Sequence, residues 1–485
     1  MSPDPAAAER RKWLALMLLA VAQFVVVLDA SITNVALPSI GRDLEISQEN
    51  LAWVVNGYTL VFGGFLLLGG RIADLVGRRR MFIVGLVLFS AASLVGGFST
   101  SEGMLIAARA VQGLGAALVS PAALSILTVT FAEGPERNKA MGVWGAVAGS
   151  GGAAGVLLGG MLTEWLSWEW VLWVNVPIGI VAAILALSLI DESRQQSDTR
   201  HFDIAGAVSV TAGLSILVYA LVDANDAGWG SGQTLGLLAL SAALLAAFVV
   251  VERRSRSPLV PFRIFGNRTL TGANVTGLLI GASLFSMFFY ISLYMQQTLG
   301  YDALKAGVAY LPLALTIIMA AGIASALVTK IGFKPVLLGG LSLVVIALLW
   351  FSQVSVGGSY VGDILFPSVI AGAGLGFAFV PVTLAATHGT DEHDAGLASG
   401  LINTSQQVGG ALGLAVLSAV AAGVTGTVVP GAPGSVEALT DGFQAAFLTG
   451  AGLAALGVVS AALLIRGSDS KALIGAEVAP GTAVG

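Results

Sequence analysis

Residues 49–80 read ENLAWVVNGYTLVFGGFLLLGGRIADLVGRRR, and this stretch decides the fold of the chain. Residues 51–70 carry no charge, whereas residues 71–80 contain four arginines and one aspartate. An apolar helix of about 20 residues crosses the ~30 Å hydrocarbon core of a bilayer. The run shows no alternation of period two, so a strand is disfavoured. The stretch therefore predicts a membrane-spanning helix that ends in a basic loop.

The same pattern recurs along the whole chain of 485 residues. Hydrophobic residues make up 56% of the sequence and charged residues 11%, against about 25% charged residues in soluble proteins. This composition excludes a soluble globular protein, a disordered chain and a nucleic-acid binder. The absence of cysteine excludes disulfides and thiolate metal sites. We predict fourteen spans, at 13–37, 49–70, 81–98, 103–124, 140–162, 170–190, 203–223, 233–251, 270–296, 306–328, 335–352, 360–386, 396–422 and 443–465.

The positions of the basic residues predict the orientation of these spans, because inner loops are enriched in Lys and Arg. With the N-terminus inside, the outer loops hold only Arg42 and Lys305, and Arg109 lies within a span. The other 20 of the 23 basic residues fall in segments placed inside. We therefore expect both termini in the cytoplasm, and the first run is too long for the apolar part of a cleaved signal peptide.

The longest inner loops divide the spans into six, two and six. We expect a six-helix bundle at 1–190, a linker with two extra spans at 191–269, a second bundle at 270–466 and a flexible cytoplasmic tail at 467–485. Transporters built from two repeated bundles around a midplane site have this arrangement. The loop Gly70–Arg80 also has a degenerate copy at Ser325–Lys334, in which Gly77 matches Gly332 and Arg79 matches Lys334.

Five segments carry a resemblance to a known family. They are the loop Gly70–Arg80, LDASITNVALP at 28–38, RAVQGLGAA at 109–117, GGAAGVLLGG at 151–160, and WEW at 168–170 followed by NVPIG at 175–179. With fourteen spans, the chain resembles the fourteen-helix drug:proton antiporter branch of the major facilitator superfamily. This resemblance implies an all-α fold of two six-helix bundles plus two extra linker helices. The chain departs from the family pattern at Val156, where proline is usual, and at Glu169, where arginine is usual.

Two charges lie inside the predicted spans at similar depth. Asp29 is about eight residues from the outer end of its span and Arg109 about six, a difference of ~3 Å in depth. An ionised Asp at mid-membrane costs about 2.5–3.5 kcal/mol and is usually functional. The two side chains could pair, or alternate between pairing and proton loading, and the resemblance implies proton coupling. The alternative is a static ion pair, and Gln112 either orients Arg109 or contacts substrate.

Two further motifs are assigned roles by the resemblance. The loop residues Gly70, Asp74, Gly77, Arg78 and Arg79 are expected to form a conformational latch between the bundles, although arginines there also suit anionic lipid. The glycines of the fifth span are expected to form the antiporter motif, a seal against proton leak or simply a close helix contact. These glycines are Gly151, Gly155, Gly159 and Gly160.

The substrate site is expected near the midplane and should be lined by amides and aromatic rings, which suit bulky amphipathic molecules. The candidates are Gln23, Phe24, Asn56, Tyr58, Gln112, Asn274, Tyr290, Tyr294, Asn403, Gln406 and Gln407. No metal-ligand spacing, catalytic set or phosphate-binding loop is present in the sequence, so we expect no cofactor other than the proton gradient. The predicted function is proton-driven export of drug-like or secondary-metabolite compounds by a monomer in a bacterial inner membrane. A transporter of one defined metabolite is the alternative, and a membrane enzyme is a remote one.

Overall fold

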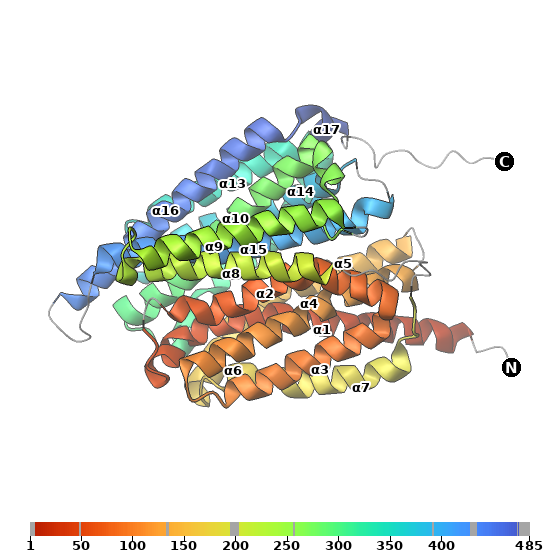
Figure 1. Ribbon diagram of the computed structural model, residues 1–485, viewed down its shortest axis with the longest axis horizontal. Helices are drawn as coiled ribbons and strands as arrows, with labels where there is room; N and C mark the ends of the chain where they lie inside the picture. The colour runs from red at the N-terminus through yellow and green to blue at the C-terminus, as the bar shows by residue number, and fades with distance from the viewer. Residues whose placement is uncertain are drawn as a thin grey trace. The chain divides into compact units, whose positions relative to one another are not determined.

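The computed structural model describes residues 5–47, 50–131, 135–194, 203–255, 258–389, 392–426, 434–472 and 474. Every regular element within these ranges is a helix (Figure 1). The contacts of the chain divide it into two compact units. Unit 1 comprises residues 1–220, 227–259 and 301–308, and unit 2 comprises residues 221–226, 260–300 and 309–485.

The helices of unit 1 come from the first half of the chain. They are α1 (Pro5–Asp43), α2 (Leu51–Val76), α3 (Arg78–Gly97), α4 (Glu102–Thr130), α5 (Pro135–Trp165), α6 (Trp170–Trp173), α7 (Asn175–Leu189), α8 (Ile204–Ala227) and α9 (Gly232–Arg254). The end of α8 is assigned to unit 2, and most of the short helix α11 (Ala303–Ala309) is assigned to unit 1.

Unit 2 contains the second set of long helices. They are α10 (Arg268–Leu293), α12 (Leu311–Ile331), α13 (Phe333–Phe351), α14 (Phe366–Thr387), α15 (Glu392–Thr425) and α16 (Ser435–Leu464). A 3-10 helix η1 (Phe262–Gly266) precedes α10, and π-helical turns η2 (Tyr294–Thr298) and η3 (Tyr360–Leu365) adjoin α10 and α14. The segment predicted as a tail begins with a short helix, α17 (Gly467–Ala472), and residues 475–485 lie outside the described residues.

The predicted spans coincide with these helices. Thirteen helical segments in the described part of the chain are long and apolar enough to cross a membrane. The remaining predicted run, 140–162, lies within α5. Many large apolar side chains on the helices are exposed, which suits contact with lipid rather than water. The prediction of an all-helical polytopic membrane protein with about fourteen spans is confirmed.

The same helix pairs pack in both units. In unit 1, α1 packs on α4, α5 and α7, α4 packs on α2 and α3, and α3 packs on α7 (Figure 1). In unit 2 the equivalent contacts join α10 with α14, α15 and α16, join α14 with α12 and α13, and join α13 with α16. Two bundles with one packing scheme are what an internal repeat produces. The extra helices α8 and α9 contact one another where Ser241 Oγ donates to the Gly213 carbonyl at 2.8 Å.

The repeated loop forms the same turn in both bundles. Gly77 separates α2 from α3 and has φ 135°, and Gly332 separates α12 from α13 and has φ 82°. Residues with a Cβ atom are strained at such positive φ angles, so glycine allows the chain to pass directly from one helix to the next. Arg79 Nη1 donates to the Ile190 carbonyl after α7, and Lys334 Nζ donates to the Ile465 carbonyl after α16. The match between Arg79 and Lys334 therefore holds at the level of contacts.

Candidate functional site

The buried polar cluster of unit 1 is built around Asp29 and Arg109. Arg109 Nη1 donates to Asp29 Oδ2 at 2.6 Å, so α1 and α4 are joined by an ion pair. Asp29 is 0% exposed and Arg109 1% exposed. A charge removed from water must be paired and hydrogen-bonded, and each of these side chains supplies the partner of the other.

Gln112 contacts both members of the pair. Its Oε1 accepts from Arg109 Nη1 at 2.7 Å, and its Nε2 donates to Asp29 Oδ1 at 2.7 Å. The spacing of three residues places Gln112 and Arg109 on one face of α4. Gln112 therefore bridges the two charges, as orienting the arginine would require, and a contact with substrate stays a prediction.

Two residues that sequence reasoning did not single out complete the cluster. Asn175 Nδ2, at the start of α7, donates to Asp29 Oδ1 at 2.8 Å. Ser93 Oγ of α3 accepts from Gln112 Nε2 at 2.6 Å. Asn175 is the polar residue of the NVPIG segment that carries the family resemblance, and this is a usable signal, whereas nothing in the sequence distinguishes Ser93 from other serines.

The other face of Arg109 is fixed by α2. Arg109 Nε donates to the Val54 carbonyl at 3.1 Å, and its guanidinium lies 4.6 Å from the centroid of the Tyr58 ring. A guanidinium over an aromatic face is attracted by the ring quadrupole. Tyr58, predicted to contact substrate, is buried here and its hydroxyl donates to the Val26 carbonyl at 3.4 Å. Its ring therefore supports the arginine.

The glycines of α5 lie against α1. A Cβ atom on Gly159 would lie 2.7 Å from the Ile32 carbonyl oxygen, and one on Gly155 would lie 2.9 Å from the Leu28 carbonyl oxygen. A Cβ on Gly151 would meet Val27 at 3.1 Å, and Gly160 faces Ala303 in the same unit. Three of the four predicted glycines thus line the contact between α5 and the helix that carries Asp29.

The predicted latch residues lie at the end of α2, at the turn and at the start of α3. Arg78 Nε pairs with Asp74 Oδ1 at 2.8 Å, and Ser125 Oγ of α4 donates to the same oxygen at 2.9 Å. Gly70 lies on the same helix as Asp74 and packs against Pro121 of α4. The predicted latch residues are thus tied to the C-terminal half of α4.

Glu192 caps the first turn of α3 at this latch. Its two carboxylate oxygens accept from the backbone N–H groups of Arg79 and Arg80, at 3.2 and 3.1 Å. A carboxylate at a helix N-terminus satisfies free N–H groups and complements the helix dipole. Sequence reasoning missed Glu192 because it is distant in the chain and lies in a loop that was treated only as a linker.

The remaining substrate candidates of unit 1 differ in their surroundings. Asn56 is 0% exposed, and neither atom of its amide has a hydrogen-bond partner among the described residues. Gln23 is partly buried, and its Oε1 also has no hydrogen-bond partner among the described residues. Phe24 packs against the apolar core. Such unpaired buried amides are rare and call for an explanation.

The candidates of unit 2 are mostly engaged within the bundle. Tyr290 and Tyr294 are buried, and their hydroxyls donate to Ser418 Oγ at 3.3 Å and to the Ser355 carbonyl at 2.8 Å. Asn274 Oδ1 accepts from Ser405 Oγ at 2.9 Å.

Three candidates lie on α15. Asn403 is exposed and donates to the Ser399 carbonyl of its own helix at 2.9 Å, whereas Gln406 and Gln407 are partly buried. The backbone carbonyl of Gln406 lies against Gly281 of α10. The candidates of unit 2 therefore occupy several local environments rather than one cluster.

Comparison with known proteins identifies the family. The family model of the Major Facilitator Superfamily matches residues 19–414. Among solved structures, a bacterial homologue of the human lysosomal transporter Spinster has a TM-score of 0.68 at 15% identity, covering 95% of this chain and 98% of that one. The nucleoside transporter NupG has a TM-score of 0.65 at 12% identity, covering 94% and 100%. These likenesses establish the fold.

The sequence relatives are closer. The cephamycin export protein CmcT of Amycolatopsis lactamdurans is 43% identical over 86% of this chain and 86% of its own length. The puromycin resistance protein pur8 of Streptomyces alboniger is 40% identical over 91% and 87%. The multidrug resistance protein Stp of Mycobacterium tuberculosis is 32% identical over 87% and 78%. The chain therefore belongs to the major facilitator superfamily, a family of transporters and not of enzymes, and is related there to the drug and antibiotic efflux proteins.

Proposed function

We propose that this chain exports amphipathic, drug-like molecules by alternating access, in exchange for protons that move inward through Asp29. The observation that carries the proposal is the sealed ion pair of Asp29 and Arg109 within membrane-spanning helices. An ionisable residue in a span is costly and is retained where it serves a pathway. The names of the relatives, which concern cephamycin, puromycin and other drugs, support the substrate class.

The hydrogen bonds suggest how a proton is exchanged. Asp29 accepts from Arg109, Gln112 and Asn175, so three donors already face the carboxylate. Protonation would place an O–H where the cluster offers another donor, and it would leave Arg109 as an uncompensated buried charge. Proton loading must therefore accompany a rearrangement of α1 against α4, and this requirement couples protons to the conformational cycle.

The glycine contact supports such a rearrangement. The face of α1 that carries Leu28 and Ile32 packs directly on Gly155 and Gly159 of α5, and the Ser31 hydroxyl lies where a Cβ on Gly155 would stand. A contact with such small residues lets α1 shift against α5 while the helices stay close enough to exclude water. We assign the glycine motif to this seal.

Asn56 is proposed to contact the substrate. Its buried amide has both a donor and an acceptor unpaired in the described part of the chain, and an unsatisfied polar group of this kind costs about 1–3 kcal/mol. A polar group of the transported molecule would remove that cost. An Asn56→Ala variant should raise the substrate concentration for half-maximal transport and retain the maximal rate.

The function is tested in everted membrane vesicles that contain the protein and are acidified inside by respiration. A transported compound should partly dissipate the pH gradient. The panel of test compounds contains a cephamycin and puromycin, which the names of two relatives mention. Vesicles without the protein are the control. No response to the panel, together with a response to a single sugar or amino acid, would favour a transporter of one defined metabolite.

A protease-protection experiment on the same vesicles tests the orientation. The positions of the basic residues support a cytoplasmic location for both termini in a bacterial inner membrane. A protease site added after the last residue should be protected in intact cells and cleaved in everted vesicles.

A further inference from the structure

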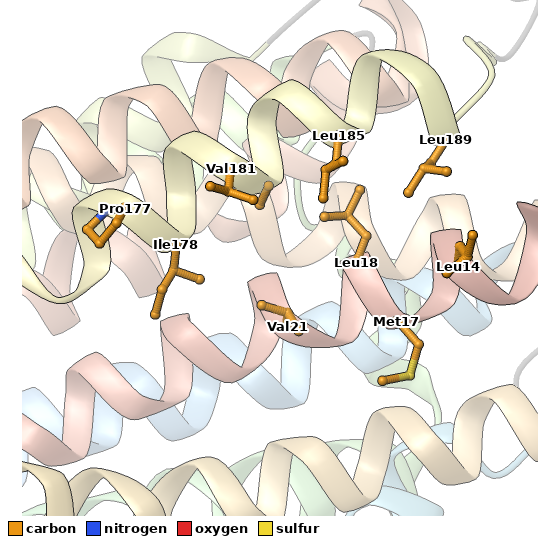
Figure 2. A pocket seen from close by; sticks show the side chains of 10 residues that line it. Leu14, Met17, Leu18, Val21, Pro177, Ile178, Val181, Leu185 and Leu189 are labelled. Carbon is orange, nitrogen blue, oxygen red and sulfur yellow. The ribbon is translucent and has the colours of Figure 1, made fainter.

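An apolar groove runs along the outer surface of unit 1 between α1 and α7. Leu14, Met17, Leu18 and Val21 of α1 form one wall, and α7 supplies the other from Pro177 to Leu189 (Figure 2). The groove encloses about 520 Å³, which lies within the range of small-molecule sites. Its walls are open to the surroundings, since Met17 is 57% exposed and Val181 54% exposed.

The length of the groove matches one leaflet of a bilayer. Pro177 and Leu189 are separated by twelve residue steps, a rise of about 18 Å along α7. Half of the ~30 Å hydrocarbon core is about 15 Å. All ten lining residues are apolar, so the groove offers no polar partner along this length. An extended hydrocarbon chain from one leaflet is the occupant that fits both features.

Basic side chains lie at one end of the groove. Arg10 is exposed and precedes Leu14 by four residues, so it lies on the same face of α1 as the groove wall. Arg11 crosses to α7, where its Nε donates to the Ser188 carbonyl at 3.2 Å and its Nη2 pairs with Asp191 at 2.7 Å. Figure 2 shows Leu14 and Leu189 together at this end and Pro177 towards the other.

Arg10 is the arginine on the groove face of α1 at this end. Asp191 is matched by Arg11, and the neighbouring Glu9 keeps its charge while it accepts from Trp13 Nε1 on the same helix. Arg10 places a positive charge on the groove face at the depth where lipid phosphates lie when the groove is filled by an acyl chain.

The geometry points to a binding site for an anionic phospholipid, with one acyl chain in the groove between α1 and α7 and its headgroup at Arg10. Both helices also reach the buried cluster, through Asp29 on α1 and Asn175 on α7. A bound chain would therefore support the contact between these two helices. The site is independent of the transported molecule.

The test uses the full chain in vesicles of phosphatidylcholine with a minor fraction of phosphatidylglycerol. Either lipid carries a photoreactive diazirine in its acyl chain, and labelled peptides are identified by mass spectrometry. Labelled phosphatidylglycerol should mark residues 14–21 and 177–189, and unlabelled phosphatidylglycerol should compete better than phosphatidylcholine. Arg10→Gln should reduce this preference about fivefold, which is the ratio for ~1 kcal/mol per basic residue near a membrane surface.

Two further variants sharpen the outcome. Val181→Trp fills the groove from an exposed position and should lower labelling by both lipids. Arg254→Gln removes an exposed arginine at the end of α9 and should leave the labelling of α1 and α7 unchanged. Equal labelling by the two lipids, or an unaltered preference in Arg10→Gln, would overturn the proposal. Absence of label from both helices would also overturn it, as expected where a second copy of the chain covers the groove.

Discussion

Arg109 Nη1 lies 2.6 Å from Asp29 Oδ2, and both side chains are sealed within the bundle. Removing one member of a buried ion pair generally costs about 3–5 kcal/mol, because the other charge is left without compensation. The surrounding donors and acceptors fit only this charged pair. The relationship therefore constrains both folding and proton exchange, and substitutions can separate the two.

Asp29→Asn should abolish proton exchange. The amide keeps the size of the side chain but cannot cycle between a charged and a neutral form. Purified wild-type protein should release or take up protons when a transported compound is added, and the variant should give no pH signal while still binding the compound. Asp191→Asn is the matched control, since Asp191 pairs with Arg11 at the surface and should give the wild-type signal. Full proton-driven export by Asp29→Asn would refute the role of Asp29.

Arg109→Lys should impair transport despite retaining the charge. The guanidinium contacts Asp29, Gln112, the Val54 carbonyl and the Tyr58 ring at once, and an ammonium group cannot reproduce this planar fork. Transport in vesicles should fall at least tenfold, with the protein still folded.

The pair can be tested further by its thermodynamic coupling. The destabilisations caused by Asp29→Asn and by Arg109→Gln should together exceed that of the double variant. The difference is the coupling energy, which we expect to be about 0.5–3 kcal/mol. Thermal unfolding in detergent measures the stability of the two single variants and the double variant relative to the wild type. Additive effects would mean that the two side chains act independently.

The sequence predicts the spans and the pair for a physical reason. Long uncharged runs can only be buried in a membrane, and charges within them are scarce, so Asp29 and Arg109 stand out. Their shared depth followed from counting residues along two helices. The sequence also predicts the repeat, because Gly77 and Gly332 occupy turns that require glycine.

The remaining contacts of the site depend on how the helices pack, which the sequence alone does not determine. Ser93 and Glu192 join the cluster and the latch through packing of helices that are far apart in sequence, and neither has a periodic or compositional signal. Tyr58 and Tyr290 were placed at suitable depth, but depth does not determine which way a side chain points around a helix. Tyr58 faces Arg109, and Tyr290 packs against Phe443 and Phe447.

Gly159→Ala should destabilise the protein, whereas Gly152→Ala should not. A Cβ on Gly159 would lie 2.7 Å from the Ile32 carbonyl oxygen, while a Cβ on Gly152 meets nothing within 4 Å. Crowding of this kind costs about 1–3 kcal/mol, and alanine in an open helical position stabilises by up to ~1 kcal/mol. The unfolding temperatures in detergent should therefore move in opposite directions. Equal shifts would show that the contact between α1 and α5 is loose.

Asp469 should contribute stability that is lost in acid. The hydrogen bond from Thr269 Oγ1, at 2.5 Å, lowers the pKa of this carboxyl below its ordinary value and outweighs the opposing effect of burial. Ser468, His388 and Arg466 lower the pKa further. A carboxyl whose folded pKa lies below its unfolded pKa stabilises the fold above the unfolded value, near 3.8. That contribution disappears as the pH falls through the folded pKa.

Asp469→Asn should therefore unfold at a lower temperature than the wild type at neutral pH, and the difference should vanish at the acid end. Asp469 is partly exposed, so the effect is expected to be small. Thr269→Val should behave like Asp469→Asn, and Thr269→Ser, which keeps the hydroxyl, should retain the wild-type dependence on pH. An identical pH profile in Thr269→Val and the wild type would show that the contact between α10 and α17 does not hold this carboxylate.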